Sequence, residues 1–361
     1  MKKLNFIIKC GLALLLLSFY SCESWLNVTP SDRLSEEMLF NDREGFVKAL
    51  NGVYIELNTN ELYGRNLTAG ALDVMGQYYS VASSSHAFYN YGGLVYTGND
   101  EKALFDNMWQ KCYAVIACCN TIIEKCDENK AGLSPVWRGS IKGEALALRA
   151  MLHFDMLRLF GPLTSELDKE SIPYQTNSDQ TVTPLLSGSE VVGLILDDLK
   201  NAVGLLKDTD PYFVEEEFSD TDLNYRRFRM NYFAAKGLMA RVQLWGGDKE
   251  KAAATAKEVI AEGQAEGAEF FPFVTNSEAT SSNPDRVFYS EVLFGTYHSS
   301  REKLHEDLFA PTLESTSILT LAGTARRDDL YDNENDYRYS VWSTYNKNGT
   351  SVLYHRKFEK Q

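Results

Sequence analysis

Residues 141–162 read IKGEALALRAMLHFDMLRLFGP, and they are the strongest indication of the architecture in the whole chain. Apolar side chains occupy so many of these positions that they would cover most faces of a helix. A helix that is apolar nearly all round is stable only when other elements surround it. Gly161-Pro162 ends the pattern, because neither residue favours continuing a helix. We therefore expect a helix over about Ile141 to Phe160, in a central position.

The segment before it predicts a long amphipathic helix over about Glu101 to Cys126. Its apolar residues recur at positions i, i+3, i+4 and i+7, the spacing of one wide helix face that must be buried. Three cysteines share this face at intervals of seven, whereas metal sites need convergent cysteine or histidine ligands at other spacings. We interpret these cysteines, with their neighbour Cys118, as small buried apolar side chains. The three on the stripe are Cys112, Cys119 and Cys126.

Four more helices follow from end signals and periodicity. Ser187 and Glu190 fit a capping box at the start of a helix over 187–206. Two shorter helices, 231–245 and 249–261, flank a turn that contains Gly246-Gly247-Asp248, and 42–57 reads as another helix near the front.

The pair at 231–261 resembles a tetratricopeptide unit, in which small residues lie where the two helices cross. Ala240 and Ala252 fill those positions. Such units bury their apolar faces by stacking, and 104–160 and 187–206 are the candidate neighbours. The sequence thus predicts a mainly α, tetratricopeptide-like helical repeat scaffold.

Long tracts between the helices lack a clear period, namely 63–100, 163–186, 208–228 and 267–361. Loops of that length in a compact protein usually carry function or are ordered by their own packing. We expect them to form a loop-rich ligand-binding part.

The N-terminus predicts export. Lys2 and Lys3 precede an apolar run that is too short to span a bilayer, and Ser21-Cys22 follows it, so residues 1–21 read as a signal peptide. Residues 16–22, LLSFYSC, resemble a bacterial lipobox, in which the cysteine becomes the first mature residue and carries acyl chains. Cys22 is therefore the predicted lipid anchor. The alternative is an ordinary cleaved signal with an incidental cysteine.

Charge excludes some partners. The formal net charge is −14 for the whole chain, and loss of residues 1–21 removes three lysines and makes it −17. Nucleic acid and anionic lipid would both be repelled by such a surface. We expect neither as a partner.

Several stretches, in the right order along nearly the full chain, resemble the SusD/RagB family of outer-membrane nutrient-binding lipoproteins. The helix that ends in Phe-Gly-Pro is the most specific of them. The matching stretches are Cys22–Pro30, Phe40–Tyr54, Glu144–Pro162, Ala235–Asp248, Asp336–Arg338 and Arg356–Phe358.

The resemblance implies a function as well as a fold. Members lie on the cell surface and cover a TonB-dependent transporter of the SusC type. They pass oligosaccharides, or in some branches peptides, to this transporter and catalyse no reaction. It implies that residues 22–361 form one SusD-like domain. Members usually continue past the equivalent of Phe358 into a further helical segment, which we expect this chain, ending at Gln361, to lack.

Candidate ligand contacts lie in the first long loop. A sugar packs the CH-rich face of its ring on an aromatic side chain, and polar groups bind its hydroxyls. The tract 73–92 supplies such rings with polar residues between them, and Tyr297 is a later candidate, ahead of Trp342 and Tyr345. The alternative is that these rings pack inward and fix the loop to the scaffold. The predicted contacts are Tyr78, Phe88, Tyr89, Asn90, Tyr91 and Tyr297.

We expect no catalytic residues, cofactor or metal. The chain contains no HExxH, no GxSxG and no P-loop spacing. Two other functions stay open: a tetratricopeptide adaptor that grips proteins of the cell envelope, and a surface glycoside hydrolase, whose carboxylate pair sequence alone cannot place.

Overall fold

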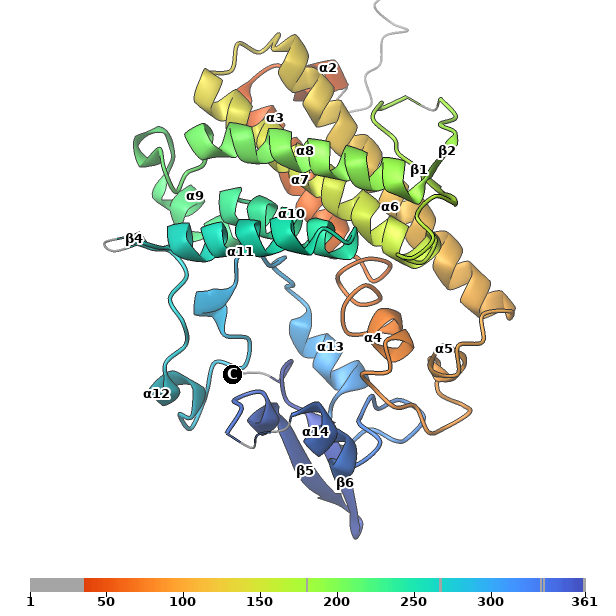
Figure 1. Cartoon of the computed structure of the whole chain (residues 1–361). Coiled ribbons are helices and arrows are strands. Elements are labelled where there is room, and N and C mark those ends of the chain that lie inside the picture. The colour runs from red at the N-terminus through yellow and green to blue at the C-terminus, as the bar shows by residue number, and fades with distance from the viewer. Residues whose placement is uncertain (1–35, 180, 266–267, 332, 334, 360–361) are drawn as a thin grey trace, which may run out of the picture.

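Long helices form the upper part of the molecule in Figure 1, and loops with short elements form the lower part. The computed structural model describes residues 36–179, 181–265, 268–331, 333 and 335–359. None of the helices in these residues is both long and apolar enough to cross a bilayer. The long helices are α3 (Arg43–Leu57), α6 (Asn99–Glu128), α7 (Pro135–Phe160), α8 (Gly188–Thr209), α10 (Tyr232–Trp245) and α11 (Lys249–Gly263).

The mainly α prediction is confirmed, and each predicted helix coincides with one of these six. The end signals also act as expected. Ser187 and Glu190 form the capping box of α8, with Ser187 Oγ accepting from the Glu190 N–H at 3.3 Å. Asp42, Asn231 and Asp248 cap α3, α10 and α11 through their side chains.

Helix α7 is central, as its sequence predicts. It packs against α6, α8, α3 and α10, and the side chains of Leu148, Leu152 and Leu157 are fully buried. Gly143 permits the close approach of α8, because a Cβ atom there would lie 2.7 Å from Leu206 Cγ. The large apolar core of the molecule forms around this helix.

Helices α10 and α11 pack against each other as the predicted helix pair. Ala240 and Ala252 are both buried, which agrees with their expected place between the two helices. Helix α10 also packs on α8, and α8 packs on α7, so successive helices stack into one tetratricopeptide-like scaffold.

A buried ionic network joins these helices at one point. The Arg226 guanidinium donates to Asp210 at 2.7 and 2.9 Å, and it also contacts Glu144 of α7. Tyr54 of α3 donates to Glu144 at 2.7 Å, and Asp210 accepts from the Tyr232 N–H of α10 at 2.8 Å. The network therefore ties α3, α7, the end of α8 and the start of α10 together.

The remaining elements are short and lie on the loops of the chain. They are α2 (Glu36–Leu39), α4 (Ala71–Met75), α5 (Tyr89–Gly92), β1 (Glu170–Pro173), β2 (Leu185–Ser187), η2 (Glu215–Glu217), α9 (Asp220–Asn224), η3 (Arg226–Phe228), β3 (Gln264–Ala265), β4 (Ala268–Glu269), α12 (Asn276–Ala279), η4 (Tyr289–Glu291), α13 (Arg301–Leu308), α14 (Thr324–Leu330), η5 (Tyr339–Val341), β5 (Trp342–Lys347) and β6 (Thr350–His355). Of these, α2, α9 and the β1–β2 and β3–β4 pairs lie beside the long helices, whereas α4, α5, α12–α14 and β5–β6 lie below them (Figure 1).

The prediction that 267–361 is irregular needs one correction. Strands β5 and β6 pair antiparallel over six residues each, from Trp342 opposite His355 to Lys347 opposite Thr350. The turn between them has Asn348 and Gly349 at positive φ, 52° and 85°, which is the Asn-Gly turn that joins two twisted strands most readily.

The prediction that the four cysteines are small buried side chains is confirmed for three of them and wrong for Cys118. Cys112, Cys119 and Cys126 are buried along α6, Cys118 is exposed, and all four are free thiols. The predicted signal peptide and Cys22 lie outside the described residues, so they remain predictions.

Replacing Arg226 with methionine should destabilise the scaffold strongly. The change leaves the carboxylates of Asp210 and Glu144 buried without their shared cation, and such a loss typically costs about 3–5 kcal/mol of unfolding free energy. Urea unfolding followed by circular dichroism measures it. The matched control is Lys48→Met, which removes an exposed pair with Glu44 and should leave the unfolding curve nearly unchanged. Equal midpoints for the two variants would contradict the role given to the network.

Candidate functional site

The loop-rich part has an aromatic core of its own. Residues from 69–91 pack there against residues from 304–358, well separated in sequence. The ring centroid of Tyr79 lies 5.4 Å from that of Phe309 and 6.2 Å from that of Trp342, and all three side chains are almost fully buried. This packing gives rigidity to long loops and fixes the residues around them.

Two of the predicted contacts belong to this core. Phe88 and Tyr91 are each 3% exposed, and their rings meet edge to face at 5.9 Å. They are three residues apart at the short helix α5, so both side chains share its inner face. Neither ring offers a face to a ligand, which is the inward packing that was the alternative for this loop.

Their neighbours Tyr89 and Asn90 lie on the outer face of α5 and are exposed. Asn90 Nδ2 donates to Glu101 Oε1 at 2.8 Å and so holds α5 against the start of α6. Neither residue lines one of the hollows described below.

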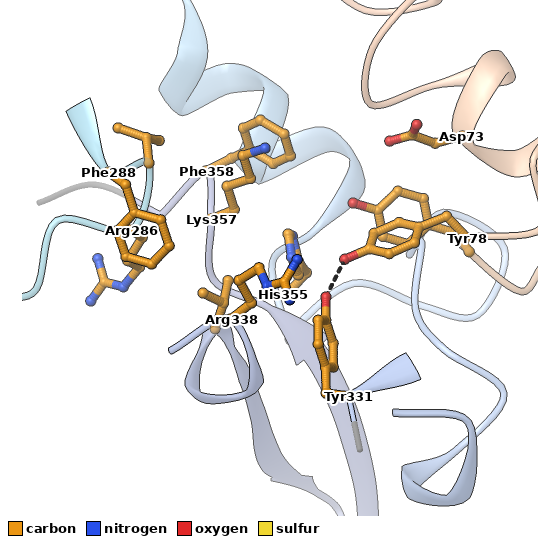
Figure 2. Close-up of a pocket in the computed structure, with 12 residues that line it drawn as sticks. Asp73, Tyr78, Arg286, Phe288, Tyr331, Arg338, His355, Lys357 and Phe358 are labelled. Atoms are coloured by element: carbon orange, nitrogen blue, oxygen red, sulfur yellow. Dashed lines mark hydrogen bonds between the residues drawn. The ribbon is translucent and has the colours of Figure 1, made fainter. Parts of the chain in front are cut away.

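Tyr78 lines a hollow with a volume of ≈ 320 Å³. We call it the main hollow because it holds a predicted contact, although a larger hollow of ≈ 670 Å³ lies beside β5 and β6. Figure 2 shows that three chain segments meet at the main hollow: Asp73 and Tyr78 come from the first loop, Phe288 from a middle loop, and Tyr331, Arg338 and Phe358 from the C-terminal part. The lining residues are Asp73, Tyr78, Tyr79, Arg286, Val287, Phe288, Tyr331, Arg338, Val341, His355, Lys357 and Phe358.

Two phenols form one wall of the main hollow. The hydroxyls of Tyr78 and Tyr331 are 2.8 Å apart and share one hydrogen bond (Figure 2). Burial and this bond raise the pKa of Tyr78 well above the usual range for a phenol, so its hydroxyl stays protonated. A shared bond between two phenols uses one of their two protons, and the second O–H can donate to another group.

Asp73 adds a hydrogen-bond acceptor to the main hollow, whereas the tyrosines add a donor. Desolvation raises the pKa of its carboxyl to about 6, although Lys357 acts in the other direction. No hydrogen bond to this carboxylate is formed within the part of the chain that the structure describes. At neutral pH, Asp73 is therefore an acceptor that faces the hollow without a partner.

The other polar groups of the main hollow are bases. Lys357 is exposed and has no carboxylate within 4.0 Å among the described residues, whereas Arg338 pairs with Asp336 at 2.5 Å. Burial, with a smaller effect from Lys357, lowers the pKa of His355 to about 3. His355 is thus neutral at physiological pH and acts as part of the aromatic wall.

A side hollow of ≈ 280 Å³ lies next to the main hollow. Tyr78 and Tyr79 line both hollows, and Gln77, Arg326 and Leu321 line only the side hollow. Gln77 Nε2 donates to the Gly92 carbonyl at 3.0 Å, so its amide holds the loop in place. The two hollows therefore adjoin each other at Tyr78 and Tyr79.

Tyr297 lies in a different place. It is 67% exposed and meets Phe228 edge to face at 5.6 Å, and Phe228 also contacts Tyr289. We call Phe228, Tyr289 and Tyr297 the aromatic patch. Of the lower-ranked candidates, Trp342 is buried in the aromatic core and Tyr345 is exposed on β5.

Of the six predicted contacts, Tyr78 is the one that lines the main hollow and the side hollow. Sequence reasoning singled out the segment 73–79 but assigned no role to Asp73, and it did not connect this loop with Tyr331 or Lys357. A signal was present, because Arg338, Lys357 and Phe358 lie in the two C-terminal stretches, 336–338 and 356–358, that carry the family resemblance. Residues of both stretches therefore line the main hollow.

The arrangement suits binding of a polar ligand with apolar faces. It combines aromatic rings, a free acceptor and free donors in an open hollow. The described residues contain no group of three histidine, cysteine or acidic side chains placed to hold a metal ion.

Fold and hollow together define a helical-repeat protein with a pocket built by its loops. Residues 24–244 match the family model for SusD-like proteins described as "Starch-binding associating with outer membrane". The chain belongs to the SusD-like family.

Relatives and solved structures agree with this assignment. A SusD-like protein of Formosa agariphila, P2, is 25% identical over 265 residues, which is 72% of this chain but 46% of that protein. A SusD-like protein of Bacteroides ovatus is 30% identical over 146 residues, 39% of this chain and 23% of that protein. The chain thus spans less than half the length of these curated relatives.

A solved SusD-like carbohydrate-binding protein of Bacteroides vulgatus shares the fold, with a TM-score of 0.66 and 21% identity over 88% of this chain and 66% of that one. A second SusD superfamily structure from the same organism gives a TM-score of 0.65 at 18% identity, over 88% and 69% of the two chains.

Replacing Asp73 with asparagine should stabilise the protein above pH 6. Because the folded-state pKa of Asp73 lies above its ordinary value of 3.8, the native state loses stability as the pH rises from 4 to about 6, and asparagine removes this loss. We expect a gain of about 1–3 kcal/mol at pH 7.5 and almost none at pH 4. Thermal unfolding at the two pH values measures it.

The control for this prediction is Asp106→Asn, on the exposed face of α6, which should show no such pH-dependent gain. A gain at Asp73 that is the same at both pH values would show that the carboxylate is not desolvated in the way described.

Proposed function

We propose that this protein is a surface lipoprotein of the outer membrane that captures oligosaccharides in the main hollow and passes them to a SusC-like TonB-dependent transporter. The Tyr78–Tyr331 pair facing the unpartnered Asp73 carboxylate carries the proposal. The family description, starch-binding and associated with the outer membrane, supports the ligand class and the location.

The chemistry of the main hollow meets what a sugar needs. Aromatic rings with a polar edge accept the CH-rich face of a sugar and tolerate water beside it. An ionised carboxylate can accept from two neighbouring hydroxyls, and the free phenol proton and the Lys357 ammonium can donate to ring or hydroxyl oxygens. The hollow is open to solvent, so a sugar chain can extend beyond the ring that it binds.

Binding without hydrolysis is part of the proposal. Glycosidases usually place two carboxyl groups on either side of the scissile bond. Among the described residues that line the two hollows, Asp73 is the one carboxylate. This favours capture over the hydrolase alternative, and the family description favours it over the adaptor.

Replacing Tyr331 with alanine should weaken glycan binding at least tenfold, because it removes a wall of the main hollow and leaves Tyr78 without its partner. An array of plant, algal and host oligosaccharides identifies the tightest glycan, and titration calorimetry with that glycan gives the Kd values. A loss of about tenfold corresponds to roughly 1.4 kcal/mol of binding free energy.

The matched control is Tyr345→Ala, an exposed tyrosine of β5 outside both hollows, which should bind as the parent does. Equal affinity in the Tyr331 variant would discard the main hollow as the site. Release of shorter sugars during the titration would favour the hydrolase.

The lipid anchor is tested with the full chain expressed in a Gram-negative bacterium. Growth with a labelled fatty acid should label the parent, and Cys22→Ser should abolish the label, because the anchor needs this thiol. Cys10→Ser is the matched control in the same leader and should keep the label. A Cys22→Ser variant that still carries the fatty-acid label would contradict the assignment of Cys22 as the lipid anchor.

The transporter is tested by purifying the labelled protein from membranes in mild detergent. Recovery of a large TonB-dependent barrel supports delivery, whereas recovery of periplasmic proteins without a barrel supports the adaptor.

A further inference from the structure

The charges around the two hollows differ from those of the chain as a whole. The chain contains 50 acidic and 36 basic residues, yet the described charged residues that line the two hollows are four bases and one acid. The bases are Arg286, Arg326, Arg338 and Lys357, and the acid is Asp73.

These four bases are not equally available. Arg338 pairs with Asp336, and Arg286 is buried with Glu359 3.6 Å from its guanidinium. Lys357 and Arg326 are both exposed, and neither has a carboxylate within 4.0 Å in the described part of the chain. An exposed cation that is free of a carboxylate can form a charge-assisted hydrogen bond with a ligand at little cost in desolvation.

The two available cations lie in different hollows. Lys357 lines the main hollow and Arg326 the side hollow, and the two hollows share Tyr78 and Tyr79. Tyr79 is almost fully buried, so a sugar ring can lie against Tyr78. A ligand bound there could place one anionic group toward each cation. Asp73 lies across the main hollow from Lys357 in Figure 2, where it would accept from hydroxyls and not face the same group.

We propose, on the basis of the capture function above, that the ligand is an anionic oligosaccharide, which carries carboxylate or sulfate groups and spans both hollows. Its acidic groups bind Lys357 and Arg326, and its sugar rings pack on the Tyr78–Tyr331 pair. The acidic surface elsewhere repels such a ligand, but at physiological ionic strength charges beyond about 8 Å are largely screened. The local cations therefore decide the affinity.

The experiment compares matched pairs of probes on the full chain purified in detergent. The pairs are tetragalacturonate and α-1,4-galactotetraose, tetramannuronate and β-1,4-mannotetraose, and a carrageenan tetrasaccharide before and after desulfation. Calorimetry gives Kd for each at physiological ionic strength. In at least one pair, the acidic member should bind about tenfold more tightly or better, the change expected for one hydrogen bond to a charged group.

Lys357→Gln and Arg326→Gln should each remove most of that preference, since both side chains are exposed and the fold does not depend on them. The control Lys249→Gln, an exposed lysine of α11 outside both hollows, should keep it. A preference for carboxylate over sulfate, or the reverse, identifies which anion the site takes.

Three results would overturn the inference. If every glycan that binds is neutral, the anionic assignment fails and the capture function stands. If an acidic glycan binds but both glutamine variants keep the full preference, the cations of the hollows are not its partners. If no glycan binds in these pairs or on the array, the capture function fails as well.

Discussion

The Arg226 guanidinium holds the scaffold and its loops in one arrangement, because it is shared between the carboxylates of Glu144 and Asp210 in a fully buried position. Its effect reaches beyond the helices. The next residue, Arg227, donates to the carbonyl of Tyr289 at 3.0 Å, and the Arg227 carbonyl accepts from the Gly295 N–H at 3.0 Å. The loop that follows the last long helix is thereby fixed to the point where the scaffold helices meet.

The aromatic core of the loop-rich part orders the long loops. The loops of the lower part are too long to be ordered by helix packing, so they are ordered by aromatic rings from distant segments. This core leaves Trp342 Nε1 and His355 Nδ1 buried without a hydrogen-bond partner in the described residues. Unpaired buried groups cost stability, and so does the desolvated carboxylate of Asp73. We interpret these costs as the consequence of keeping an open, polar hollow beside an aromatic core.

The sequence predicts the scaffold well because the scaffold depends on local periodicity. The wide stripe of α6, the apolar α7 and the capping box of α8 all follow from residues within one helix. The Asn348-Gly349 turn was also a readable signal for a hairpin, but we assigned its whole tract to irregular structure. Local patterns are sufficient for such elements.

The site was harder to predict because it depends on contacts between distant segments. Tyr78 and Tyr331 are 253 residues apart in sequence, and no periodicity connects them. The density of aromatic residues in 73–92 indicated a functional loop, but density does not say which rings face inward. The spacing of Phe88 and Tyr91 could have shown that they share a face. Which face is buried depends on the C-terminal segment that packs there.

The central claim is that ligand binds in the main hollow, which is lined by the Tyr78–Tyr331 pair, Asp73 and Lys357. A crystal structure of the protein with its tightest oligosaccharide tests it most directly. We predict sugar density between Tyr78, Tyr331 and Lys357, with a ring against the phenols. Density confined to the aromatic patch around Tyr297, with the main hollow holding only solvent, would contradict it.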